Sequence, residues 1–144
     1  MSVFFSRQCE YALQSVIYLA QKKQGDMTTI KEISSHLNIP FHFLGKIFQK
    51  LSHKGLLNSM KGVSGGFWLA KPSNEIHLFD IVEAIDGREV INSCVLGFSE
   101  CSSTEPCPMH ETWKKTKDVF FGELMEKTLF DVSRNMKKDG YLAA

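Results

Sequence analysis

The sequence predicts a mainly α-helical fold with one small β-hairpin (α+β), arranged as a winged helix-turn-helix domain followed by a long helix. Three runs with apolar residues at helical spacing precede two short β-type runs that flank a glycine-rich turn, and a longer helical run follows. The 144 residues, 43% of them hydrophobic, suffice to bury a core without disulfides. We expect the winged domain over residues 1–86, a loop over 87–110, and a long helix with a C-terminal tail over 111–144.

The first two helices are predicted from capping residues. Ser6 is a suitable N-cap for an amphipathic helix over residues 7–21. Thr29 and Glu32 have the spacing of a capping box, in which Thr29 bonds forward and Glu32 reaches back. A second, short helix should therefore begin there, and Pro40 closes the turn that follows it.

A third helix is predicted over residues 41–54, and a hairpin follows it. Its apolar stripe consists of Phe41, Leu44, Ile47, Phe48 and Leu51. Gly45 is unfavourable in this helix by up to about 1 kcal/mol relative to Ala, and clearance against DNA or against a neighbouring helix would explain it. Residues 56–61 and 67–71 are predicted to form two strands joined by a turn over 62–66, which is the wing.

Charge is distributed unevenly along the chain. Residues 1–71 hold nine Lys/Arg and three Asp/Glu, a net charge of +6, whereas residues 72–144 hold eight and thirteen, a net charge of −5. A basic winged domain suggests double-stranded DNA as the partner, with the third helix in the major groove and the wing on the backbone or minor groove. The residues expected to contact DNA are Ser6, Arg7, Thr29, His42, Lys46, Gln49, Lys50, Lys54, Lys61, Ser64 and Gly65. The alternative is a solvated basic surface beside an ordinary hairpin.

The second half is predicted to hold a short helix and a long one. Asp80 and Glu83 have capping-box spacing and should open a helix that Asp86 and Gly87 end. The long helix, over residues 111–129, carries a broad apolar band of Trp113, Phe120, Phe121, Leu124, Met125 and Leu129. Either the same helix of a second copy covers this band, giving a two-fold dimer suited to a palindromic operator, or the helix packs on its own chain.

Four potential metal ligands lie within seventeen residues: Cys94, Cys101, Cys107 and His110. The loop that holds them is rich in Gly, Ser and Pro and poor in apolar residues, so we do not expect the thiols to be core residues. An irregular backbone lets several thiolates converge on one metal, which lowers their pKa values. His110 has an alternative role as a hydrogen-bonding residue in the first turn of the long helix. Cys9 is interpreted as a small buried hydrophobe.

The order of these elements resembles the IscR/NsrR family of bacterial iron-sulfur winged-helix regulators over about Phe5 to Val132. The residues that carry the resemblance are Glu10-Tyr-Ala-Leu13, Lys61-Gly-Val-Ser-Gly-Gly-Phe67, Ile81-Val-Glu-Ala-Ile85, Cys107-Pro-Met-His110-Glu-Thr-Trp113 and Thr128-Leu129. The resemblance implies a homodimeric repressor or activator that senses iron-sulfur status, redox state or nitric oxide through its cluster.

The resemblance also implies a 2Fe-2S cluster held by Cys94, Cys101, Cys107 and His110, with 4Fe-4S as the alternative cluster type. Spacing between the first two cysteines is one residue longer than is common in the family, which leaves the cluster type open. Glu10 is the alternative fourth ligand, because a carboxylate at this position can come from the second subunit in NsrR-like members. The cluster can also be lost, leaving an apo form.

Three other interpretations remain open at the level of sequence. Zinc suits a Cys3His set, although the short C-x2-4-C knuckles typical of structural zinc are absent. A metal-free thiol switch needs exposed thiols near a resolving cysteine. An electron-transfer iron-sulfur protein would not need a basic wing, and the chain has no dinucleotide-binding or P-loop motif, so we expect no enzyme. With no membrane span and no secretion signal evident, we expect a cytoplasmic protein.

Overall fold

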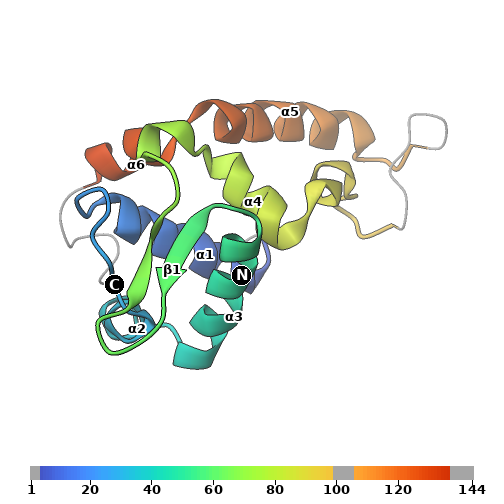
Figure 1. Cartoon of the computed structure of the whole chain (residues 1–144). Coiled ribbons are helices and arrows are strands. Elements are labelled where there is room, and N and C mark those ends of the chain that lie inside the picture. The colour runs from blue at the N-terminus through green and yellow to red at the C-terminus, as the bar shows by residue number, and fades with distance from the viewer. Residues whose placement is uncertain (1–3, 99–105, 137–144) are drawn as a thin grey trace.

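The computed structural model describes residues 4–98 and 106–136, and its first half is the expected winged helix-turn-helix (Figure 1). The chain forms α1 (Arg7–Ala20), α2 (Ile30–Leu37) and α3 (Phe41–His53), followed by the antiparallel strands β1 (Leu57–Met60) and β2 (Gly66–Leu69). The boundaries agree with the sequence expectation to within two residues. The mainly helical fold with a two-stranded hairpin is confirmed.

The main core lies between α1, α2, α3 and the base of the hairpin. Ile33 and Leu37 of α2 are buried as expected, and so are Leu44, Ile47, Phe48 and Leu51 of α3. Phe41 was predicted to belong to this stripe, and that prediction was wrong, because its side chain is 57% exposed. It is the first residue of α3 and follows the exposed Pro40, so it lies at the outer end of the helix.

The helix α4 (Leu78–Asp86) begins earlier than predicted. His77 is its N-cap, and Asp80 is the residue that reaches back, accepting a hydrogen bond from the His77 backbone N–H at 2.8 Å. The predicted Asp80–Glu83 capping box was therefore wrong by one turn. Glu83 instead accepts a hydrogen bond from Arg88 at 2.5 Å, in the short 3-10 helix η2 (Arg88–Asn92) that leads toward Cys94.

The long helix predicted over residues 111–129 is α5 (His110–Glu126), and a further helix, α6 (Leu129–Asn135), follows it. The break comes at Lys127, where the backbone is extended, and Thr128 with Asp131 forms a capping box that starts α6. Backbone hydrogen bonds hold this break to the segment before α4, since Leu129 N–H donates to the Ile76 carbonyl at 2.8 Å. The side chain of Leu129 is fully buried in the main core. The prediction carried the long helix on to Leu129 and missed both α6 and this return to the core.

A second core lies where α5 crosses α4 and the start of α1. Its buried residues are Cys9, Phe79, Val82, Phe121 and Leu124. The ring of Phe4 stacks on Phe120 with centroids 4.2 Å apart. The chain thus buries much of the apolar band for which a second copy was one of the two expected covers. The large apolar side chains of α5 that stay exposed are Val119 at 72% and Met125 at 43%.

Cys9 is fully buried in this second core, which confirms its interpretation as a small hydrophobe. Burial, followed by the nearby Asp86 carboxylate, raises the pKa of the Cys9 thiol far above its ordinary value.

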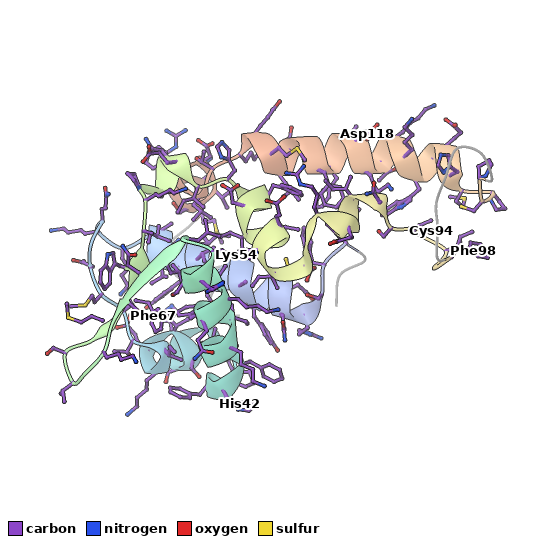
Figure 2. The ribbon with its side chains drawn as sticks, turned by 45° about the vertical axis from the view of Figure 1, so that its right-hand side comes forward. His42, Lys54, Phe67, Cys94, Phe98 and Asp118 are labelled. Atoms are coloured by element: carbon purple, nitrogen blue, oxygen red, sulfur yellow. The ribbon has the colours of Figure 1, made fainter. Side chains whose placement is uncertain are left out.

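Figure 2 shows that Cys94 and Phe98 lie at one end of the molecule, whereas Phe67 of the hairpin lies toward the other. The described start of the cysteine loop and the hairpin therefore lie toward opposite ends of the molecule.

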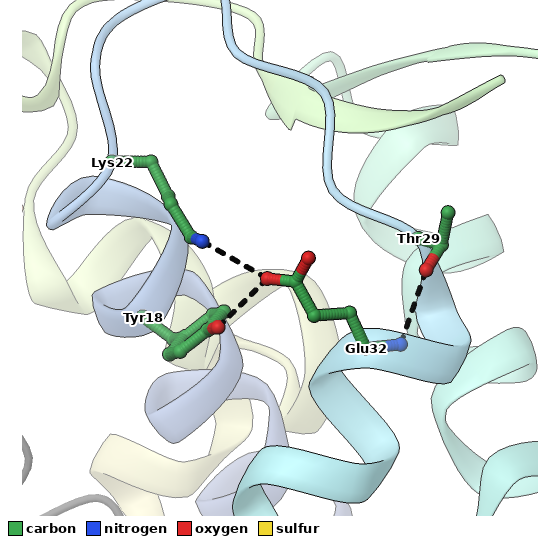
Figure 3. Close-up of polar contacts among 4 residues, drawn as sticks. All are labelled: Tyr18, Lys22, Thr29 and Glu32. Carbon is green, nitrogen blue, oxygen red and sulfur yellow. Dashed lines mark hydrogen bonds and ion pairs between the residues drawn. The ribbon is translucent and has the colours of Figure 1, made fainter. Parts of the chain in front are cut away.

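One capping prediction was half right. Thr29 caps α2 by accepting a hydrogen bond from the Glu32 N–H at 3.1 Å. The carboxylate of Glu32 does not reach back to its own helix (Figure 3). It accepts a hydrogen bond from the Tyr18 hydroxyl at 2.8 Å and pairs with the Lys22 ammonium at 2.9 Å. Glu32 therefore ties α2 to the end of α1.

Candidate DNA-binding surface and cysteine loop

The outward face of α3 carries the polar residues expected to read DNA. His42, Lys46, Gln49 and Lys50 are exposed, because helical periodicity places them away from the apolar stripe. Lys54 caps the C-terminal end of the helix and is exposed as well. In Figure 2, His42 and Lys54 mark the two ends of this helix. The face is open along its length and has the residue types that bind base edges and phosphates.

The wing turn is tight and needs its glycines. Gly65 N–H donates to the Gly62 carbonyl at 3.0 Å, and Gly62 has a φ of +108°. A Cβ at Gly65 would lie 2.0 Å from the Met60 carbonyl oxygen, so only glycine fits there. Lys61 and Ser64 are exposed beside the turn. The wing thus presents one cation and one hydroxyl on a backbone that can approach a partner closely.

The start of α1 adds Arg7 to this surface. The Arg7 guanidinium lies 5.9 Å from the centre of the Tyr11 ring, and the Tyr11 ring lies 6.3 Å from that of Phe43 at the start of α3. The Phe43 ring stacks in turn on the His42 ring, with centroids 5.0 Å apart, so two aromatic rings connect Arg7 with His42. Phe43 was not singled out from the sequence. The only feature that could have indicated its role is that this aromatic residue follows the polar His42 and lies just off the apolar stripe of the helix.

Ser6 and Thr29, also expected to contact DNA, both act as helix caps. The Ser6 hydroxyl accepts from the Cys9 N–H at 3.1 Å and donates to the Asp86 carboxylate, to which the Ser6 N–H also donates at 2.9 Å. Thr29 is exposed at the start of α2, where the helix N-terminus favours phosphate. Ser6 therefore links α1 to the end of α4, a contact with no signal in local sequence.

The structure brings two of the three loop cysteines together. The Sγ atoms of Cys94 and Cys107 lie 3.7 Å apart, and both side chains are partly exposed thiols that are not joined in a disulfide. Cys101 lies outside the described residues. His110, the first residue of α5, is 9% exposed, and its backbone N–H donates to the Cys107 carbonyl at 3.0 Å. The pair therefore sits at the base of the loop, against the start of α5.

Two residues of α5 fix the chain just before Cys94. The indole N–H of Trp113 donates to the Ser93 carbonyl at 2.7 Å, and the Lys117 ammonium donates to the same oxygen at 3.2 Å. Lys117 also lies over the Trp113 ring, 5.6 Å from its centre, and is only 9% exposed. The role of Lys117 was missed in the sequence, although its i, i+4 spacing from Trp113 places the two on one helix face.

The geometry of the cysteine pair suits one tetrahedral metal. Two thiolates bound at about 2.3 Å to a tetrahedral ion are separated by about 3.8 Å, close to the 3.7 Å found between Cys94 and Cys107. A disulfide would need about 2.05 Å. Within residues 4–98 and 106–136, no three His, Cys, Asp or Glu side chains gather closely enough to hold a metal ion. The candidates for the further ligands are Cys101, His110 after a rearrangement, and a residue such as Glu10 from a second copy.

Comparisons with known proteins agree with this architecture. The sequence pattern of the Rrf2 family, described as an iron-dependent transcriptional regulator, matches residues 5–135. A protein of Aquifex aeolicus (strain VF5) that bears the name of an HTH-type transcriptional regulator is 34% identical over 145 residues, covering 92% of this chain and all of that protein. None of the helices in the described part of the chain has the length and apolar character needed to cross a membrane.

Solved structures of transcriptional regulators share this fold. CymR (YrzC), the global cysteine regulator of B. subtilis, superimposes with a TM-score of 0.78 at 27% identity, covering 92% of this chain and 98% of that one. The oxidized form of Staphylococcus aureus CymR gives 0.75 at 25% identity, with 96% and 100% covered. The T. potens IscR structure gives 0.72 at 22% identity, with 94% and 89% covered, which shows a shared fold. The chain therefore belongs to the Rrf2 family of winged-helix transcriptional regulators, not to a family of enzymes.

Proposed function

We propose that this DNA-binding regulator changes its affinity for an operator according to the state of an iron-sulfur cluster, most simply 2Fe-2S, held by its cysteine loop. The observation that carries the proposal is the Cys94–Cys107 pair, set 3.7 Å apart at the base of the loop. Thiolates are the ligands that iron-sulfur clusters prefer. Cys101 completes the cysteine set, with His110 or Glu10 of a second copy as the fourth ligand.

The way α5 holds the loop supports a sensing role. Trp113 and Lys117 fix the Ser93 carbonyl, and α5 packs through Phe121 on the same core that contains Cys9 of α1. A change at the cysteines would therefore reach α1 and the DNA-binding surface through packed side chains. Such coupling has an effect only if the two cluster states differ in DNA affinity.

Anaerobic purification tests the cluster. The wild-type protein is expected to be coloured and to contain iron and acid-labile sulfide, and Cys107→Ser is expected to lose both. Cys9→Ala is the matched control, because Cys9 is fully buried in the second core and is not a proposed ligand, so the iron content should stay unchanged. Equal iron content in all three proteins would overturn the proposal, whereas zinc without sulfide in the wild type would favour a zinc site.

A thiol switch is a second candidate, favoured by the same pair of sulfurs. In an apo form, a peroxide could take two electrons and two protons from Cys94 and Cys107, forming a disulfide while the peroxide is reduced to water. The sulfurs would have to move from 3.7 Å to about 2.05 Å. The related S. aureus CymR has been solved in an oxidized form. Mass spectrometry of peroxide-treated, iron-free protein should then find a peptide pair joined through these two cysteines.

We infer that the regulator acts as a homodimer on a palindromic operator and that α5 contributes to the interface. Val119 and Met125 are apolar and exposed on this helix, and no atom lies within 4 Å of a Cβ built at Gly122, so a second helix has room to approach. Val119→Glu should shift the mass in solution from dimer to monomer, as measured by light scattering. Lys114→Glu, on the same helix, is the control, and an unchanged dimer in Val119→Glu would place the interface elsewhere.

A further inference from the structure

A cavity of about 290 Å³ lies on the winged domain, apart from the DNA-binding surface. Its walls come from the end of α1 and the turn after it, from β2, from the segment that leads into the 3-10 helix η1 (Ser73–Glu75), and from α6. None of the residues expected to contact DNA lines it. A molecule bound there would not have to compete with the operator for space.

Cations predominate around the cavity. Lys22, Lys23 and Lys71 line it, and Asp26 is the one carboxylate among its lining residues. Lys22 is paired with Glu32 (Figure 3), whereas Lys23 and Lys71 form no ion pair with any carboxylate in the described ranges. Three ammonium groups and one carboxylate line this concave surface, and two of the ammonium groups form no ion pair within the described part of the chain, so the local charge favours an anion there.

The position of Lys23 follows from the local backbone. The Asp26 N–H donates to the Lys23 carbonyl at 3.0 Å, and Gly25 has a φ of +88°, so residues 23–26 form a tight turn. Thr28, just after this turn, exchanges two backbone hydrogen bonds with Phe67 of β2, each 2.9 Å long. These bonds hold the Lys23 turn beside the strand that provides the opposite wall.

The remaining walls are apolar and partly exposed. Trp68 and Leu69 of β2 are half-buried, and Phe130 of α6 is 43% exposed although it borders the cavity. Ser73 and Asn74 add polar groups. An aromatic wall with a few convergent polar and cationic groups is the usual composition of a small-molecule site.

We propose that this cavity binds a small organic anion, a carboxylate or phosphate ester with a short apolar body, between Lys23 and Lys71 and against Trp68 and Phe130. The anion contacts Lys22, which holds Glu32 of α2, and β2, which carries the wing. Both parts of the DNA-binding module therefore meet the ligand. This site does not depend on the cluster and stands whether or not the loop binds iron.

The test is a titration of ¹⁵N-labelled protein followed by NMR, with n-butyl phosphate as the probe. Inorganic phosphate and 1-butanol supply the two halves of the probe separately. The chain has two tryptophans, so Trp113→Phe assigns the indole signal of Trp68. We expect saturable shifts of that signal and of the amides of residues 22–26 with butyl phosphate, and weaker binding of either half.

Charge-removing variants give the second measurement. Lys23→Gln and Lys71→Gln should each weaken binding of butyl phosphate roughly tenfold, since each removes a charged hydrogen-bond donor. Lys114→Gln is the matched control, because Lys114 is exposed on α5 and does not line the cavity. The proposal is overturned by the absence of saturable shifts, by equal weakening in Lys114→Gln, or by shifts centred on Lys46 and Lys50 of α3.

Discussion

Removing the carboxylate of Asp86 should destabilise the protein by separating α1 from the end of α4. Asp86 accepts two hydrogen bonds from Ser6, one from its backbone N–H at 2.9 Å and one from its hydroxyl. Hydrogen bonds to a charged group contribute about 1.5–3 kcal/mol each when buried. Both residues are half-buried, so Asp86→Ala should lower the free energy of unfolding by about 2–3 kcal/mol for the pair of bonds.

The expected change in melting temperature follows from chain length. An unfolding entropy of about 2.1 cal/mol/K per residue gives about 0.3 kcal/mol/K for 144 residues, so the melting temperature should fall by about 7–10 °C. Thermal unfolding followed by far-UV circular dichroism measures this shift. Asp118→Ala is the control, because Asp118 is exposed on α5 and should change stability by less than about 0.5 kcal/mol.

A double-mutant cycle separates the contact from other effects. Ser6→Ala removes the hydroxyl bond together with the cap of α1, and the Asp86→Ala/Ser6→Ala protein should be more stable than additivity predicts by about 1 kcal/mol. If Asp86→Ala melts at the same temperature as Asp118→Ala, the contact does not hold α1 in place and the reasoning fails.

The remaining predictions concern DNA contacts and pH. Lys46→Ala should weaken binding to the operator more than binding to random DNA. Lys61→Ala should weaken both about equally and reduce the slope of log affinity against log salt concentration by about 1. Equal losses on both DNAs for the two variants would count against these roles. The Lys22 ammonium, followed by the Tyr18 hydroxyl, lowers the pKa of Glu32 below its ordinary 4.5. The Glu32 contacts therefore stabilise the fold at neutral pH and are lost as pH falls below 4.5, so Glu32→Gln should show a shallower loss of stability in acid by chemical denaturation. An acid dependence identical to that of the wild type would show that Glu32 is not involved.

Local patterns predicted most of the winged domain. Ser6 and Thr29 cap their helices, the buried stripe of α3 follows helical periodicity, and the glycine turn joins two strands because these features act within a few residues of each other. One exception is Phe41, whose place at the outer end of α3 depends on tertiary packing. Periodicity alone does not show where a helix leaves the core.

Long-range contacts were beyond the reach of sequence patterns. Glu32 had the spacing of a capping box, but the ammonium of Lys22 and the hydroxyl of Tyr18 offered its carboxylate stronger partners. The break before α6 depends on pairing of Thr128 with His77, far away in the chain. The position of the cysteine pair also depends on contacts far apart in the chain. Lys117 reaches the Ser93 carbonyl, just before Cys94, only because the chain folds back on α5.

The central claim, that a cluster on the cysteine loop controls DNA affinity, is tested most directly by one comparison. Operator affinity is measured anaerobically on a single preparation before and after removal of its iron, with Cys107→Ser treated in parallel. The wild-type affinity should change on iron removal, and Cys107→Ser should bind as the iron-free wild type does in both conditions. A colourless, iron-free wild-type protein that binds its operator equally well under every redox condition would contradict the claim.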